Sequence, residues 1–248
     1  MVRAMTIRDL NMQKDVRNGR SLADSSNRSL LALLQFVSPA LPVGAYSYSE
    51  GIETLVQNGK VKDLATLEHW LEQELRYGAI AVEAIALLRA YVCLESRDFQ
   101  RLKYWNNWLS AFRETEEMRR QSWQMGRSLT RLLIDLQPSL QPTVAACGDN
   151  CNFTVAFAIA AHHWQIDPHT AVLGYLYSWA SNLANAGVRL IPLGQTQGQQ
   201  LLLNLYPVLE QITATVMNAS DDSLKNCGWG LAIASMQHET LYSRLFRS

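Results

Sequence analysis

Two neighbouring segments of this chain carry almost no charge, and this limits the possible folds more than any other feature. No Asp, Glu, Lys or Arg occurs between Asp149 and Asp167, and the next one after Asp167 is Arg189. Helices without charged side chains need shelter from water on most sides. The second segment has too many hydroxyl and amide groups for a membrane span, which offers roughly 20 mostly apolar residues to lipid. We therefore expect a central helix, sheltered either by its own chain or by the second subunit of a homodimer.

The spacing of apolar residues is helical almost everywhere after Ser29. There is no clear alternation with a period of two and no Asn-Gly hairpin between strand-like runs. Composition does not shift within residues 29–248, and a chain of 248 residues can form one large core. We predict an all-α, single-domain helical bundle of roughly ten helices over residues 29–248. Residues 1–28 are polar and are expected to form a flexible tail.

Charge and cysteine content restrict the partners and the compartment. The 22 basic residues balance the 22 acidic ones, which argues against a general nucleic-acid binder and leaves proteins as the expected partners. The four cysteines follow no secretory hydrophobic region, so a reducing cytoplasm is the expected location.

Prolines and a glycine interrupt the helical pattern between Ser38 and Glu53. Pro39 and Pro42 should end the preceding helix near Ser38. Ser47 and Glu50 have the spacing of a capping box, which predicts a new helix from about Tyr48 to a left-handed cap at Asn58-Gly59. Tyr46 and Tyr48 then belong either to a recognition loop or to a helix corner with tyrosines in the core.

The remaining elements follow from caps and breakers. Asp63 should cap a helix, Gly78 should break it, and Glu83 is expected on the rim of the next helix unless it meets a cation. Further predictions are a helix from Arg113 to Leu136, a loop from Pro138 to about Asn152, a kink or break at Pro207, and a last helix over about Gly228 to Glu239.

No catalytic constellation is recognisable in the sequence. It contains neither the Gly-x-x-x-x-Gly-Lys-Ser/Thr phosphate loop nor the Gly-x-Ser-x-Gly nucleophile elbow. We therefore predict no catalytic residues and no cofactor. A chaperone that holds a metal ion directly through His162, His163, Cys147 or Cys151 is the alternative, because thiolates and imidazoles bind nickel and zinc. A helical enzyme with an unrecognised site is a third hypothesis.

Four separated motifs resemble the urease accessory protein UreF family over residues 29–248. They are Ser38-Pro-Ala-Leu-Pro-Val-Gly-Ala-Tyr-Ser-Tyr-Ser-Glu-Gly51, Met125-Gly-Arg-Ser-Leu129, Val188-Arg-Leu-Ile-Pro-Leu-Gly-Gln-Thr-Gln-Gly198 and Ala234-Ser-Met-Gln-His-Glu-Thr-Leu-Tyr-Ser-Arg-Leu-Phe-Arg-Ser248. The loop departs mildly from the usual family pattern, with Tyr46, Glu50 and Ile52 where phenylalanine, glutamine and leucine are common.

The resemblance implies a dimeric, non-catalytic helical protein that pairs with the accessory protein UreD, also called UreH. In that family the pair recruits the GTPase UreG and delivers nickel to apo-urease. The resemblance also transfers a partner-binding surface onto matching positions of this chain. The candidate residues are Tyr46, Tyr48, Arg189, Arg244, Leu245 and Phe246. Arginine and tyrosine often dominate protein interfaces. We expect Arg244 to order the C-terminal tail against the body, and Leu245 and Phe246 to add apolar contact.

Overall fold

A computed structural model describes residues 26–220, 223–225 and 228–247. Within these residues the fold consists of helices without a β-strand, which confirms the all-α prediction. A first helix covers residues 26–36. It is followed by η1 (Ala45–Ser47), α2 (Ile52–Gln57), α3 (Leu64–Tyr77), α4 (Ala79–Glu95), α5 (Phe99–Phe112), α6 (Glu116–Leu136), η2 (Pro138–Leu140), α7 (Gln141–Ala145), α8 (Phe153–His163), α9 (Pro168–Leu190), α10 (Gln195–Met217) and α11 (Trp229–His238).

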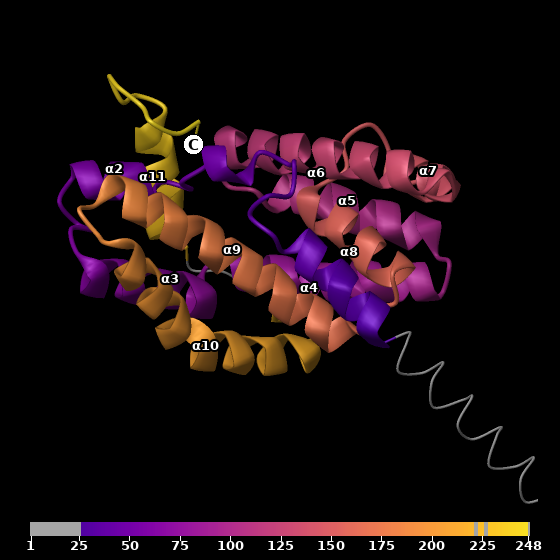
Figure 1. Cartoon of the computed structure of the whole chain (residues 1–248). Helices are drawn as coiled ribbons and strands as arrows, with labels where there is room; N and C mark the ends of the chain where they lie inside the picture. Colours follow the sequence, from indigo (N-terminus) through magenta and orange to yellow (C-terminus); the bar gives the residue numbers. More distant parts are fainter. Residues whose placement is uncertain (1–25, 221–222, 226–227, 248) are drawn as a thin grey trace, which may run out of the picture.

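The uncharged segments form the centre of the molecule, as predicted. Helix α9 runs between α3 and α10 on one side and α5, α6 and α8 on the other, with α4 behind it (Figure 1). Every residue of α8 from Thr154 to Ala161 is buried. Small residues permit close packing here: a Cβ at Gly174 would lie 2.6 Å from Leu33 Cδ1, and one at Gly187 would clash with Leu67. The chain's own helices therefore shelter α9.

The helix start in the proline loop differs from the prediction. The Ser47 hydroxyl donates to the carbonyl of Gly44 at 2.7 Å, and the Glu50 carboxylate accepts from Gln121 and Trp179, each at 2.8 Å. Tertiary hydrogen bonds have therefore replaced the capping box. The backbone is left-handed at Glu50 (φ 49°) and at Gly51 (φ 82°). Helix α2 consequently begins at Ile52, and it ends as predicted before Asn58 and Gly59.

Two other predicted boundaries were wrong for local reasons. Helix α6 begins at Glu116 because the Thr115 hydroxyl caps it by accepting from Met118 N at 3.2 Å. The predicted loop after Pro138 contains η2 and α7, since proline fits the first turn of a helix. Helix α10 continues through Pro207, which contradicts the predicted break and leaves the kink, the other predicted alternative, as a prediction. The Asp63 cap, the break at Gly78 and the last helix are confirmed.

Glu83 does not lie on a rim. Its side chain is buried and pairs with Arg113 at 2.6 Å, which is the cationic partner that the sequence left open. Arg113 can reach it because the chain leaves α5 in an extended conformation at this residue.

The prediction of a flexible tail over residues 1–28 falls mainly on residues 1–25, which lie outside the described part. Residues 26–28 belong to the first helix. Among the described helices none alone has the length and apolar composition of a membrane span, although α3 and α4 meet that test jointly, with a bend of 44° between them.

Candidate docking surface

The segment after α11 folds back onto the proline loop. Arg247 N donates to the carbonyl of Ser47 at 2.8 Å. The amides of Leu245 and Phe246 donate to the two oxygens of Glu53, at 2.7 and 3.0 Å. Figure 1 shows the C-terminal end of the chain beside the start of α2. We call residues 38–53, Arg189 and residues 239–247 together the tail junction.

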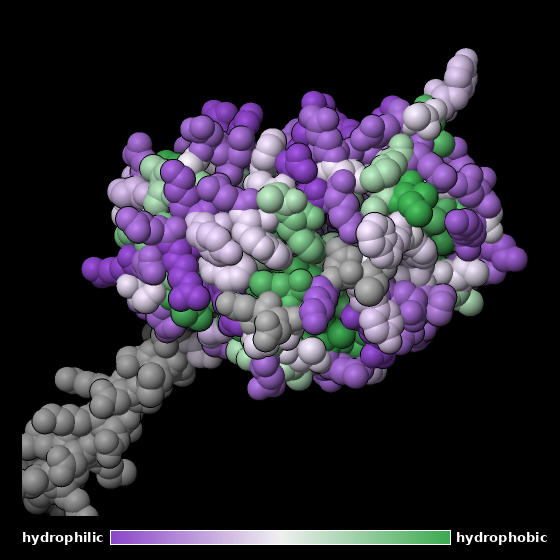
Figure 2. Space-filling model, turned by 180° about the vertical axis from the view of Figure 1, so that it is seen from behind, coloured by the Kyte–Doolittle hydropathy of each residue, from purple (hydrophilic) through white to green (hydrophobic). Residues whose placement is uncertain are grey.

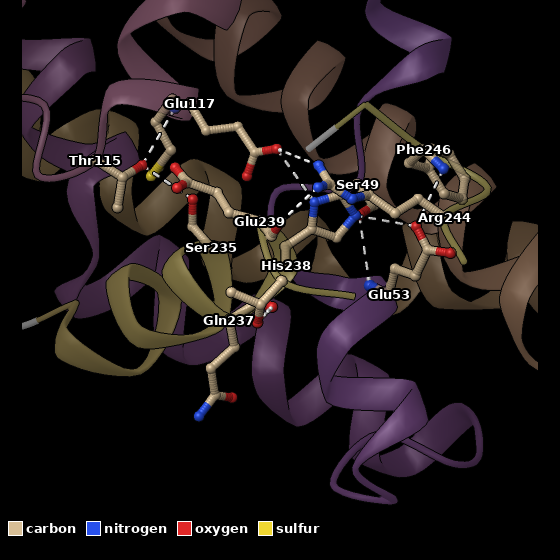
Figure 3. A network of polar contacts seen from close by, with 12 residues as sticks. Ser49, Glu53, Thr115, Glu117, Ser235, Gln237, His238, Glu239, Arg244 and Phe246 are labelled. Carbon is tan, nitrogen blue, oxygen red and sulfur yellow. Dashed lines mark hydrogen bonds and ion pairs between the residues drawn. The ribbon is translucent and has the colours of Figure 1, made fainter. Parts of the chain in front are cut away.

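A buried histidine between two carboxylates lies at the base of the tail junction (Figure 3). His238 Nε2 is 3.1 Å from Glu53 Oε2, and His238 Nδ1 is 3.2 Å from Glu117 Oε1. Burial by itself lowers the pKa of His238, but the hydrogen bonds and charges of Glu117 and Glu53 outweigh it and raise the pKa above its ordinary value. Since carboxylates only accept hydrogen bonds, the contacts on both nitrogens favour the charged imidazolium.

Arg244 closes the turn that follows α11. Its guanidinium donates to the carbonyl of Glu239 and lies 3.7 Å from Glu117 Oε1. This geometry places Arg244 where it can order the segment against the body, the role expected for it from the sequence. Leu245, by contrast, exposes 57% of its surface.

Arg189 joins the two halves of the junction. It projects from the last turn of α9, donates to the carbonyl of Tyr46 at 2.9 Å and lies 4.5 Å above the ring of Phe246. Phe246 is buried. A guanidinium over an aromatic face is attracted by the ring quadrupole. One side chain therefore ties the proline loop to the C-terminal segment.

The two tyrosines of the loop have different surroundings. Tyr46 exposes 70% of its surface, whereas Tyr48 exposes 4%. Burial raises the pKa of Tyr48 despite a hydrogen bond to Arg247. Tyr46 is therefore available to a partner, while Tyr48 and Phe246 support the surface from below.

Sequence reasoning missed an apolar face next to the junction. Trp229, Ile233 and Met236 are spaced along one side of α11 and expose 71%, 52% and 53% of their surfaces. Figure 2 shows apolar atoms at this end of the molecule, below the projecting C-terminal segment. The i, i+4, i+7 spacing was visible in the sequence, but a buried face of the last helix gives the same signal.

A cavity of about 70 Å³ lies beneath the loop. Glu50, Glu83 and Arg113 line its polar side, and Arg113 Nε has no hydrogen-bond partner among the described residues. Burial, followed by the charge of Glu83, raises the pKa of Glu50. Glu50, on the polar side of this cavity, also accepts hydrogen bonds from Trp179 and Gln121, and these bonds hold the inner surface of the loop in place.

The residues of the metal hypothesis lie elsewhere. His162 packs edge-on against Tyr91, and His163 packs in the same way against Trp164. In the part of the chain that the structure describes, no three His, Cys, Asp or Glu side chains form a group that could hold a metal ion.

Comparison with known proteins identifies the family. The profile of the UreF family matches residues 61–206. The urease accessory protein UreF of Nostoc sp. is 56% identical over 223 residues, covering 90% of this chain and 97% of its own length. The UreF of Microcystis aeruginosa is 57% identical over 221 residues, with 89% and 98% covered. The UreF of Alkalilimnicola ehrlichii is 38% identical over 218 residues, with 87% and 94% covered. The chain therefore belongs to the UreF family of urease accessory proteins.

Proposed function

We propose that this chain is a non-catalytic adaptor in the maturation of the nickel centre of urease, and that it binds its partners through the tail junction. The observation that carries the proposal is the double hydrogen bond from Leu245 and Phe246 to buried Glu53. These bonds hold a segment that would otherwise be loose against the body. Pre-ordering a segment lowers the entropy that a partner must remove on binding.

The side chains left exposed around the junction suit a protein partner. Tyr46, Trp229 and Met236 are solvent-exposed, and aromatic residues and methionine are enriched at interfaces. The partner we assign to this surface is UreD, also called UreH. The pair would then recruit the GTPase UreG, modulate its GTP hydrolysis and pass nickel to apo-urease in the cytoplasm. Cys93, Cys147 and Cys151 are free thiols, in keeping with a reducing compartment.

A homodimer is part of the proposal. Helix α9 does not supply the interface, since neighbouring helices of the same chain cover it. The helix over residues 26–36 offers a better face, because Leu30, Leu31 and Leu34 are exposed on it. Light scattering on the purified chain, with Leu31→Glu as the variant, tests this part separately.

The test of the function removes residues 240–248 and measures capture of UreD and activation of urease in a reconstituted assay. We expect both to be lost while the circular dichroism of the helices is retained. Arg101→Ala, a change on α5 outside the junction, is the matched control. Full activation by the truncated chain would contradict the role given to the segment.

A further inference from the structure

The cavity beneath the proline loop has an apolar cover and a polar base. Its volume is about 70 Å³. The cover comes from the end of the first helix and the start of the loop, and its apolar residues are Phe36, Val37, Pro39, Leu41, Val43 and Ala45. The base comes from α4, α6, α8 and α9 and from Arg113, which lies between α5 and α6. The cavity therefore separates the loop from the body at a place where charged groups face the loop.

The guanidinium of Arg113 brings a donor without an acceptor to this cavity. Its Nη1 pairs with Glu83 Oε1 at 2.6 Å, but its Nε is buried and has no hydrogen-bond partner among the described residues. The other oxygen of Glu83 accepts from the hydroxyl of Tyr175 at 2.8 Å. Buried polar groups are nearly always hydrogen-bonded, and a donor on a charged group is especially costly to leave alone. The geometry therefore calls for an acceptor from a bound molecule.

Glu50 lines the same cavity with a carboxyl group that can both accept and donate. Its oxygens accept from Gln121 and Trp179, each at 2.8 Å, and each carboxylate oxygen has room for a second hydrogen bond. Burial raises the pKa of Glu50, which favours the protonated form, and that form donates a hydrogen bond. A ligand that both donates and accepts suits either form of Glu50.

Charge and size restrict the ligand to a small neutral molecule. An anion would lie beside Glu83, and a cation would lie beside Arg113, so either ion would meet a like charge in a medium of low dielectric constant. A cavity lined with polar groups holds water, whereas an apolar cavity stays dry. By volume, the cavity has room for roughly two to four water molecules.

We propose that this cavity is a binding site for a cluster of ordered water that accepts a hydrogen bond from Arg113 Nε and bridges it to Glu50. Glu50 belongs to the proline loop, whereas Arg113 belongs to the body. The cluster thus ties the loop to the body from its inner side, separately from Arg189 and the C-terminal segment. A bridging water is enthalpically nearly as good as a direct hydrogen bond. The position of the loop that presents Tyr46 therefore depends on bound water as well as on the tail junction.

A high-resolution crystal structure of the full-length chain, with a second crystal held under xenon gas, tests the proposal. We expect water oxygens in the cavity, one of them about 2.7–3.2 Å from Arg113 Nε. We expect no xenon there, because xenon enters dry, apolar cavities. Xenon in the cavity, or an Arg113 Nε that donates directly to a protein oxygen, would overturn the proposal.

Solution NMR tests the same site with a matched pair of variants. Trp179 lines the cavity and its indole N–H donates to Glu50, so this proton should show a cross-relaxation peak with long-lived water. Ala45→Leu enlarges an apolar residue of the cover and should lose the peak, whereas Ala111→Leu, on the exposed side of α5, should keep it. No peak in the natural chain, or equal peaks in the two variants, would contradict the proposal. The crystal test decides alone if Ala45→Leu does not fold.

Discussion

The core around α4, α8 and α9 and the base of the tail junction, where Glu53 and His238 lie, are both buried, but by different means. The core consists of apolar and small side chains on helices packed closely against one another, and every residue of α8 from Thr154 to Ala161 is buried. In the junction, backbone amides and side chains more than 120 residues apart meet over two carboxylates and a histidine. Apolar burial is non-directional and stable over a wide pH range, whereas charged networks depend on protonation and on each partner. We therefore expect the core to set global stability and the junction to set partner binding.

The largest effect should come from opening the core. Leu67 is completely buried and packs against Gly187 of α9. Leu67→Ala removes this contact and leaves a cavity, so we expect the free energy of unfolding to fall by about 2–5 kcal/mol. Urea denaturation followed by circular dichroism measures it. A decrease in the free energy of unfolding no larger than that of a typical surface substitution would show that the α3–α9 contact is not part of the core.

One carboxyl group in α3 should make the stability of the body depend on pH. Burial, then the charges of Glu50 and Glu114, raise the pKa of Glu74 from 4.5 to about 8. The folded state therefore binds more protons than the unfolded chain between these values. The contribution of Glu74 to the free energy of unfolding should be greatest below pH 4.5 and fall as the pH rises to 8.

The variant Glu74→Gln removes this group. At pH 8 we expect its free energy of unfolding to exceed that of the natural chain by roughly 2 kcal/mol. This is less than the full pKa shift would give at 1.36 kcal/mol for each pKa unit, because surrounding groups relax around the charge. Thermal melts at pH 5 and pH 8 give the comparison. An unchanged slope in Glu74→Gln would show that another group titrates.

The junction should also respond to pH, through His238. Its pKa is raised in the folded chain, so its stabilising effect is complete below its unfolded pKa and is lost as pH rises through the folded value. We expect the protection of the C-terminal segment against hydrogen exchange to weaken by about 1–2 kcal/mol once the pH exceeds the folded pKa of His238. Hydrogen exchange at the amides of Leu245 and Phe246, corrected for the intrinsic pH dependence, measures this. Equal protection on both sides of the transition would mean that Glu53 holds the segment without the histidine charge.

The smallest effect on stability should come from the surface of the junction. Tyr46 is exposed, and its hydroxyl makes no hydrogen bond to the described residues, so Tyr46→Ala should change the free energy of unfolding by less than about 0.5 kcal/mol. We still expect it to weaken the capture of UreD by roughly tenfold, as for an aromatic interface residue. Tyr104→Ala on α5, a similarly exposed tyrosine, is the matched control. Equal affinity of both variants for UreD would show that the interface does not include the loop.

The sequence predicted the core better than the junction, for a physical reason. Helical spacing, the Asp63 cap and the break at Gly78 are local signals, and the burial of α9 follows from its lack of charge. The partners of Glu50, Glu53 and Glu83 come from distant parts of the chain, so local spacing predicts a cap for Glu50 and a rim position for Glu83. His238 in the last motif gave no sign of its two carboxylates, because nothing local reveals a contact made over such a distance in sequence.

The most direct test of the account is the variant Glu53→Gln. An amide keeps the shape of the side chain but has one acceptor oxygen in place of two, so it cannot serve Leu245, Phe246 and His238 together. The control is Glu116→Gln, whose carboxylate is exposed on α6. We predict that Glu53→Gln retains its helices, releases residues 240–247 to proteolysis and captures UreD at least about tenfold less well than the control. Capture equal to the control, with the segment released, would contradict the claim that the docked segment forms the binding surface.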